Sequence, residues 1–302
     1  MSKRALLTVQ SGMIYILLVV ILGLIGCAPK KNVARIPVGY SAARTANLNE
    51  LIERVNSHYA QIETFSVSHF QVKFTGGSID AGYLKQYPSA KGYLITKRPH
   101  WIYVNILNPV TSSSLVTMAS DSQNFQIWIP RENKYLMGKT DVRTSSKNPL
   151  HSVRPEHLLQ AIMVEPLSLS VSGQIYLLEE AQDQKMKFYI IHEVVANPHN
   201  GQGCLRRKLW IERQNFGLVR QHYYDCGKLL SNIYYSDEIL VKQGAFTSSI
   251  IMERIPEHYK IQLRFPNDKV RLNPNIEESS FHIAKPPKAE AVIVKGISLE
   301  DN

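Results

Sequence analysis

The chain has 302 residues, of which 44% are hydrophobic and 20% are charged, the composition of an ordinary globular protein large enough for a substantial core. Lys and Arg outnumber Asp and Glu by 35 to 25, a formal charge of +10, but the basic residues are spread along the chain. Because nucleic-acid binding needs a concentrated basic footprint, we do not expect a nucleic-acid partner.

Residues 1–26 have the layout of an export signal. Lys3 and Arg4 form a short basic start, and the aliphatic run that follows carries no charge up to Cys27. This run is shorter than the ~20 apolar residues that comfortably span a bilayer. The letters LIGC, which end at Cys27, resemble the lipobox of bacterial lipoproteins, which are cleaved before the cysteine and lipidated on it. The alternative is an uncleaved N-terminal anchor with an incidental cysteine, and both place the remaining chain outside the cytoplasm.

Residues 27–44 are polar, contain two prolines and predict a flexible tether. Ala28 follows the cysteine at a position where, in proteobacterial lipoproteins, an aspartate favours retention in the inner membrane. The lipobox resemblance therefore implies a cell-envelope protein. It implies an anchor in the outer membrane, facing the periplasm, for a source that has an outer membrane.

An amphipathic helix opens the folded part, and strand patterns follow it. Its apolar residues recur at helical spacing, with Thr45 or Asn47 as the N-cap: Leu48, Leu51, Ile52, Val55, Tyr59 and Ile62. Strands are predicted over 65–74, over 92–107 with a break at Pro99, and in hairpins over 114–138 and 173–195. A second helix is predicted over 154–168, with Pro155 in its first turn.

The stretch from Cys204 to Cys226 predicts a stapled hairpin. Apolar and charged residues alternate before and after a turn at Asn215 and Gly217, and each cysteine lies eleven residues from Asn215. The two cysteines are therefore expected to face each other across the hairpin. In an oxidising compartment such a pair is normally a disulfide. A catalytic redox pair would more often be a close C-x-x-C, which is not present here.

Further strand patterns follow over 231–239, 246–255 and 257–273, and no linker interrupts the middle of the chain. Strands joined directly by hairpins must be antiparallel. We therefore expect one domain over 45–285, mainly β with two helices, followed by a tail over 286–302. The segment AEAVIVKG in this tail could add an edge strand.

Sequence signatures of catalysis are missing from the chain. It contains no H-E-x-x-H, G-x-S-x-G, Walker-type or G-x-G-x-x-G motif, and its ten histidines are scattered. We expect no catalytic residue, no metal site and no cofactor, and we interpret the protein as not an enzyme. An enzyme with a site assembled from distant residues is the third hypothesis considered, since such sites are recognised by geometry.

The order and spacing of these elements resemble the bacterial lipoprotein-carrier superfamily, which includes the periplasmic carrier LolA and the outer-membrane receptor LolB. The likeness is carried by residues 90–109, with Gly92, a basic-proline pair at Arg98 and Pro99, and then Trp101 and Tyr103. Residues 121–138, 209–225 and 259–286 resemble later hairpins and the end of the family's domain. The cysteine pair is not a shared family feature.

The resemblance implies a curved, incomplete antiparallel β-barrel covered by helices, with an apolar cavity for acyl chains. On the strands concerned, the alternating apolar side predicts the cavity lining: Ile102, Val104, Ile106, Phe125, Ile127, Ile129, Ile261, Leu263 and Phe265. The alternative for each of these residues is simple packing against the two helices.

The leading hypothesis is a membrane-anchored lipid- or lipoprotein-binding module of the cell envelope. It would act in lipoprotein localisation or lipid handling, with acyl chains or lipoproteins as ligands held without covalent chemistry. Its contact with the membrane would be the lipid on Cys27. The alternative is an envelope scaffold or assembly lipoprotein that binds another envelope protein through the same fold.

Overall fold

The structure is a computed structural model that describes residues 43–78, 83–140, 149–169, 171–183, 186–197, 200–241 and 244–294. The predicted signal over 1–26, the lipidated Cys27 and the tether up to residue 42 lie outside these residues and stay predictions. In the described part of the chain, no helix combines the length and the apolar character needed to cross a membrane.

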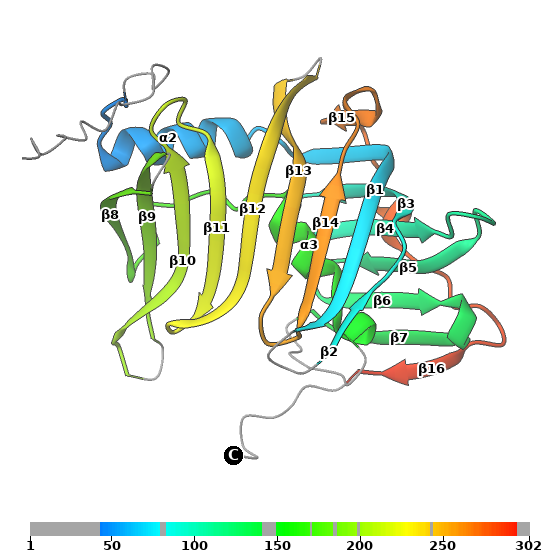
Figure 1. The fold of residues 1–302 in the computed structure, drawn as a ribbon. Helices are drawn as coiled ribbons and strands as arrows, with labels where there is room; N and C mark the ends of the chain where they lie inside the picture. The colour runs from blue at the N-terminus through cyan, green and yellow to red at the C-terminus, as the bar shows by residue number, and fades with distance from the viewer. Residues whose placement is uncertain are drawn as a thin grey trace, which may run out of the picture. The chain divides into compact units, whose positions relative to one another are not determined.

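The described residues form a single open sheet of sixteen strands (Figure 1). The strands are β1 (Thr64–Ser78), β2 (Tyr83–Gln86), β3 (Ala90–Lys97), β4 (Trp101–Leu107), β5 (Ser114–Ser120), β6 (Asn124–Ile129), β7 (Lys134–Lys139), β8 (Gln174–Gln182), β9 (Lys187–Ala196), β10 (Gly203–Glu212), β11 (Leu218–Asp225), β12 (Lys228–Val241), β13 (Gly244–Arg254), β14 (Tyr259–Arg264), β15 (Val270–Leu272) and β16 (Glu290–Ile293). Their order is β16-β7-β6-β5-β4-β3-β1-β14-β13-β12-β11-β10-β9-β8, and β2 and β15 also pair with β1.

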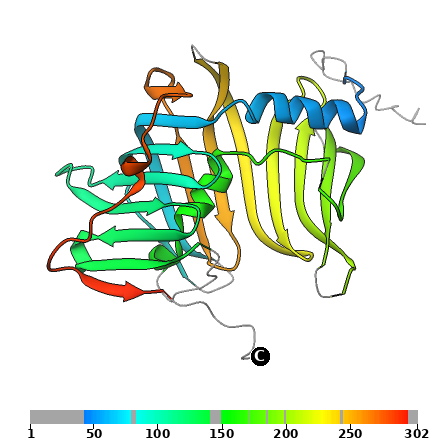
Figure 2. The ribbon, with the colours of Figure 1, turned by 180° about the vertical axis from the view of Figure 1, so that it is seen from behind.

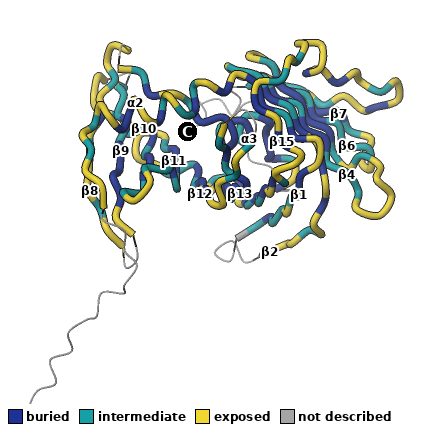
Figure 3. Tube along the Cα trace, turned by 90° about the horizontal axis from the view of Figure 1, so that it is seen from above, coloured by how far each residue is buried: buried dark blue, intermediate teal, exposed yellow. Residues whose placement is uncertain are grey.

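The sheet is strongly curved and does not close, which confirms the predicted incomplete, mainly antiparallel barrel. β8 and β16 are its two ends, and the helices lie on the concave side (Figures 2 and 3). The long strand β1 connects the two halves, because it pairs with β3 on one side and with β14 and β15 on the other. One pairing departs from the antiparallel pattern: β16, in the predicted tail, runs parallel to β7 as an edge strand.

The two α-helices of the described residues begin at the predicted signals. α2 (Leu48–Tyr59) starts with a capping box, in which Asn47 and Glu50 each accept the other's backbone amide. α3 (Pro155–Ile162) starts with Pro155 in its first turn. α3 is shorter than the predicted 154–168. The residue before a proline is disfavoured in helical conformation, so Pro166 favours extended backbone at Glu165 and limits the helix.

Cys204 and Cys226 form a disulfide, as predicted. Cys204 lies on β10, and its partner lies in the two-residue turn between β11 and β12, where Cys226 and Gly227 both have positive φ values of 44° and 93°. Such a turn is the tight connection that suits a twisted hairpin, and Gly227 adopts it without steric cost. The disulfide therefore joins the start of β10 to the β11–β12 turn.

One large hydrophobic cluster contains most of the buried apolar residues. It includes Leu51, Ile52, Val55 and Tyr59 of α2, the apolar face of α3 and the concave face of the sheet. A second, small cluster at the β16 end consists of Ala119, Tyr135, Ile283 and Ala289. The helices thus cover the concave face by burying their own apolar sides against it.

Candidate functional site

The nine residues predicted to line a cavity belong to the core on the concave face. Seven of them are at most 4% exposed, and Ile106 and Ile129 are half-buried against the same cluster. α3 contacts β4, β5 and β13 in this half of the sheet. The structure therefore brings the predicted residues together on one side of the sheet, where they pack with one another and with the helices.

An open groove lies elsewhere, between α2 and the upper ends of β11 and β12 as drawn in Figure 1. We call it the α2 groove. Its volume is about 770 Å³, within the range of small-molecule sites. Its apolar and aromatic lining comes from α2, the β9 end, the β10–β11 turn, β11 and β12: Val55, Tyr59, Met186, Phe188, Phe216, Leu218, Val219, Tyr234 and Tyr235.

Charged side chains also line the α2 groove, among them Arg54, Glu212 and Glu238. Arg54 lies over the Phe216 ring, with 4.7 Å between the guanidinium carbon and the ring centroid. Burial lowers the pKa of His58, and the nearby carboxylate of Glu238 opposes this in part. Burial and Glu238 both raise the pKa of the Tyr59 hydroxyl. His58 and Tyr59 are therefore neutral near pH 7, so the positive charge on the α2 side of the groove comes from Arg54.

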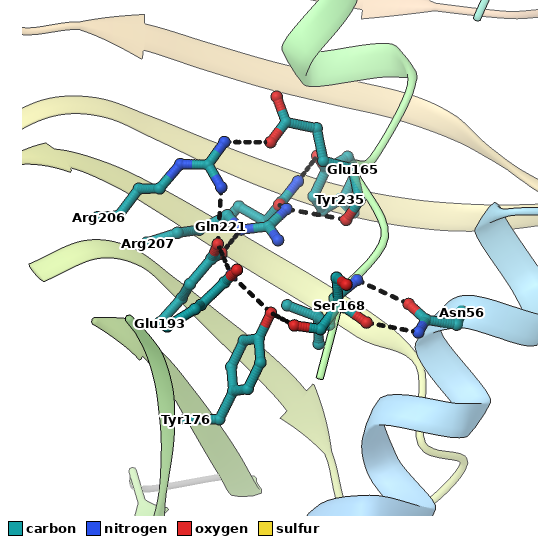
Figure 4. A network of polar contacts seen from close by, with 11 residues as sticks. Asn56, Glu165, Ser168, Tyr176, Glu193, Arg206, Arg207, Gln221 and Tyr235 are labelled. Atoms are coloured by element: carbon teal, nitrogen blue, oxygen red, sulfur yellow. Dashed lines mark hydrogen bonds and ion pairs between the residues drawn. The ribbon is translucent and has the colours of Figure 1, made fainter. Parts of the chain in front are cut away.

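A buried polar network lies on the concave face beside the groove (Figure 4). Glu193 on β9 and Arg207 on β10 are both fully buried, and a Glu193 carboxylate oxygen accepts from Arg207 Nε at 2.7 Å. The same carboxylate accepts from Arg206 at 2.7 Å, and Arg206 also pairs with Glu165 at 2.6 Å. Burial alone would lower the pKa of Arg207, but Tyr223 and the two carboxylates raise it above its usual value. The guanidinium therefore stays charged.

The network holds the segment that follows α3 against the sheet and against α2. Arg207 Nη1 donates to the carbonyl of Glu165 in this segment at 3.0 Å. The Tyr235 hydroxyl accepts from the side chain of Gln221 and donates to the carbonyl of Ala161, near the end of α3, at 3.0 Å. From the other side, the Asn56 amide both donates to and accepts from the backbone of Leu167, at 2.7 Å in each case (Figure 4). The segment is therefore enclosed between the concave face and α2.

Arg98 fixes the C-terminal end of α2. Its Nε donates to the Ile62 carbonyl at 2.8 Å, and its Nη2 donates to the carbonyls of Tyr59 at 2.8 Å and Val164 at 2.9 Å. The last carbonyls of a helix lack partners within the helix and attract positive charge. One side chain thus joins the end of α2 to the segment after α3.

A second, polar pocket of about 430 Å³ lies below α3, with the Cys204–Cys226 disulfide in its wall. Its ionisable groups pair within the protein. Arg254 and Glu257 form a two-bond ion pair at 2.9 and 3.0 Å. His157 Nδ1 lies 2.6 Å from the Tyr259 hydroxyl, and burial followed by the neighbouring arginines lowers the pKa of this histidine well below its usual value. The lining offers no apolar surface comparable to that of the α2 groove.

Among the residues that the structure describes, no group of three or more His, Cys, Asp or Glu side chains is placed to hold a metal ion. Sequence reasoning did not identify the α2 groove, the Glu193–Arg207 pair or the role of Arg98. A signal for the pair was present, because Glu193 and Arg207 occupy inward positions of strands whose other inward residues are apolar, such as Ile191 and Leu209. The groove had no such signal, since it depends on how α2 lies against β11 and β12.

No protein-family model and no curated protein matches this sequence. Among solved structures, the chain is similar to a LolA superfamily protein from Nitrosomonas europaea, with a TM-score of 0.48 and 11% identity over 79% of this chain and 99% of that one. It is also similar to a DUF1329 family protein from Desulfovibrio piger, with a TM-score of 0.47 and 16% identity over 77% of this chain and 95% of that one. A protein from Vibrio parahaemolyticus described as an outer membrane lipoprotein-sorting protein domain gives a TM-score of 0.48 and 11% identity, over 78% and 97% of the two chains. A LolA superfamily protein and a lipoprotein-sorting protein domain are thus among the solved structures similar to this chain, each at 11% identity.

Proposed function

We propose that this protein is a membrane-anchored lipid- or lipoprotein-binding module of the cell envelope that holds acyl chains without covalent chemistry. The observation that carries the proposal is the α2 groove, an open volume of about 770 Å³ that apolar and aromatic side chains line together with polar and charged ones. The lipobox-like sequence at Cys27 supports anchoring and an envelope location. The comparisons with LolA-like proteins agree with this choice.

The energetics of the groove suit an acyl chain. Each CH₂ group removed from water contributes ~0.8 kcal/mol, so about ten buried CH₂ groups supply ~8 kcal/mol, which corresponds to micromolar affinity before ordering costs. Phe188 and Leu218 contribute buried apolar walls, and neither side chain carries a charge to desolvate. The polar rim would stay in contact with a headgroup or with solvent.

The nine core residues on the other half of the sheet form part of the same proposal. In the structure they are packed into the core, and α3 contacts β4, the strand of Ile102, Val104 and Ile106. They would line a larger acyl cavity once the helices move away from the sheet. Arg98 is placed to limit this movement, because it joins the end of α2 to the segment after α3.

The test is mass spectrometry of lipid that co-purifies with the full-length protein after extraction in mild detergent. A double variant, Ser57→Trp with Val219→Trp, places two large side chains on opposite walls of the α2 groove. We expect bound lipid in the parent protein and strongly reduced lipid in this variant. A matched control, Val110→Trp with Ser113→Trp, changes the same residue types on an exposed loop and should keep the lipid.

Two results would count against the proposal. One is a parent protein that carries no lipid and takes up no fatty-acid probe. The other is equal lipid in the groove variant and in the control, provided that circular dichroism shows both to be folded.

The second candidate function is an envelope scaffold that binds another protein through the same fold. The observation that favours it is the close packing of the nine predicted cavity residues, which leaves that half of the concave face filled. A stable complex with an envelope protein, together with a lipid-free groove, would favour this function. Cross-linking from positions on the convex face followed by identification of the partner would test it.

A further inference from the structure

The convex face of β8–β12 carries aromatic and basic side chains in register. Two cross-strand rows define it. In one, Trp210, Arg220 and Tyr234 lie opposite one another on β10, β11 and β12. In the next, Lys208 lies opposite His222. Successive residues of a strand point to opposite faces, and the residues that alternate with these two rows belong to the buried network and the core. The side chains of the two rows therefore lie on the other face of the sheet.

The members of this face contact one another closely. The Arg220 guanidinium carbon lies 5.4 Å from the Trp210 ring centroid and 4.9 Å from that of Tyr234. The Lys208 ammonium lies 5.9 Å from the Tyr224 ring centroid. These contacts bring three aromatic rings and two cations together on one surface. We call this set the aromatic–basic face, and its members are Trp210, Tyr224, Tyr234, Lys208 and Arg220.

The two cations of this face form no ion pair with a described residue, although Glu253 lies on the same side, in the row of His222 and Asn232. Within the described residues, neither Lys208 nor Arg220 has a carboxylate within 4.0 Å, whereas the carboxylate of Glu179 on the same side is hydrogen-bonded to His192 at 2.7 Å. Burial, followed by the nearby charges of Arg220 and Lys208, lowers the pKa of His222 to about 4. The surroundings of His222 are therefore positive, and the face is complementary to an anionic partner.

Aliphatic side chains extend the same face to the edge of the sheet. Ile175 and Leu177 on β8 are 58% and 56% exposed. Leu177 lies opposite His192, which in turn lies opposite Lys208. Leu177 and Lys208 therefore lie on the same side of the sheet. Exposed aliphatics beside Trp, Tyr and unpaired basic residues are the combination found at membrane interfaces. There the rings lie at headgroup level and the cations meet anionic lipid.

We infer that the aromatic–basic face docks on the surface of a bilayer that contains anionic phospholipid. The rings of Trp210 and Tyr234 would lie among the headgroups, with Ile175 and Leu177 inserted beyond them. Lys208 and Arg220 would pair with lipid phosphates. Docking by this face is separate from the predicted attachment through Cys27, and it would fix the orientation of a protein that a flexible tether alone would leave free.

This inference deepens the proposed function. Docking itself does not depend on that function, but its biological role, the exchange of lipid with the groove, rests on it. Arg220 and Tyr234 line the α2 groove as well as the aromatic–basic face. A protein docked by this face would therefore hold these two groove residues next to the bilayer.

The experiment measures the approach of Trp210 to lipid. Full-length protein is mixed with vesicles of brominated phosphatidylcholine, with or without brominated phosphatidylglycerol, and quenching of tryptophan fluorescence is recorded. Trp101 and Trp128 lie on β4 and β6 in the other half of the sheet, so the variant Trp210→Phe supplies their background signal. We expect quenching that depends on phosphatidylglycerol and on Trp210.

Matched charge variants test the role of the face. Each basic side chain near an anionic surface contributes about fivefold to binding, so Lys208→Gln with Arg220→Gln should lower the docking equilibrium about 30-fold. Lys73→Gln with Lys91→Gln removes the same charge from exposed positions on β1 and β3 and should leave docking nearly unchanged.

Three outcomes would overturn the inference. They are equal quenching in the parent protein and in Trp210→Phe, quenching that ignores phosphatidylglycerol, and equal losses in the two charge variants. If the Lys208 and Arg220 variant fails to fold, the comparison of the parent protein with Trp210→Phe on the two vesicle types still shows whether the face docks on an anionic bilayer. Docking is measured at Trp210, whatever the groove contains, so a lipid-free groove with normal docking would contradict the proposed function alone.

Discussion

Replacing Glu193 by Leu should destabilise the protein far more than the loss of an ordinary ion pair. Glu193 and Arg207 are both fully buried and are joined at 2.7 Å. Glu193→Leu leaves the Arg207 cation in the core without its carboxylate partner, facing neutral groups such as the Glu165 carbonyl at 3.0 Å and the Gln221 amide oxygen at 3.4 Å. An uncompensated buried charge of this kind costs about 3–5 kcal/mol.

The partner variant and the double variant separate the charge effect from packing. Arg207→Met should cost less than Glu193→Leu, because Glu193 keeps its bond to Arg206 at 2.7 Å. In the double variant neither charge is left buried. The double variant should therefore lose less unfolding free energy than the sum of the two single variants, by about 2–3 kcal/mol, the range expected for coupled neighbours.

The assay is equilibrium unfolding in urea, with a thermal melt as a second measurement. For a protein of this size, 3–5 kcal/mol corresponds to a Tm lower by about 6–20 °C. Glu278→Leu is the control, because its partner Lys97 at 2.9 Å forms an exposed pair, which contributes at most about 1 kcal/mol. Two results would contradict this prediction. One is a Glu193→Leu loss of unfolding free energy no larger than that of the control, and the other is strict additivity of the two single losses in the double variant.

Three further changes have defined expected outcomes. Replacing Cys204 and Cys226 by Ala opens a loop with a sequence separation of 22 residues, and the chain-entropy model predicts a loss of about 3 kcal/mol in urea unfolding; an unchanged midpoint would contradict it. Gly92→Ala places a Cβ 2.6 Å from the Asn105 carbonyl oxygen, so β3 and β4 must separate, and the melting temperature should fall by the equivalent of about 1–3 kcal/mol. The pKa of His222 is lowered to about 4 by burial and then by its basic neighbours, so the unfolded chain binds the proton more readily. Stability should therefore fall as the pH drops from about 6.5 towards 4, and this part of the pH dependence should be absent from melts of His222→Asn.

Local patterns in the sequence determined the elements and much of their pairing. Asn47 and Pro155 start the two helices because a cap and a first-turn proline act within a few residues. The symmetric placement of Cys204 and Cys226 about Asn215 predicted their disulfide, since a hairpin's register follows from its turn. The mainly β, unclosed architecture followed from alternating strands linked by short turns. The length of α3 was overestimated, because the influence of Pro166 on the preceding residue was not applied.

The tertiary structure alone decided where the open space lies and which polar groups are buried. The nine predicted cavity residues were correctly assigned to one apolar face, but alternation does not say whether a ligand or a helix covers that face. The α2 groove arises from the position of α2 against β11 and β12, which depends on contacts such as those of Arg98 with distant carbonyls. The aromatic–basic face likewise needs the lateral register of five strands before its residues become neighbours. Sequence periodicity specifies the side of a strand, whereas the partner opposite that side is set by contacts between residues far apart in the chain.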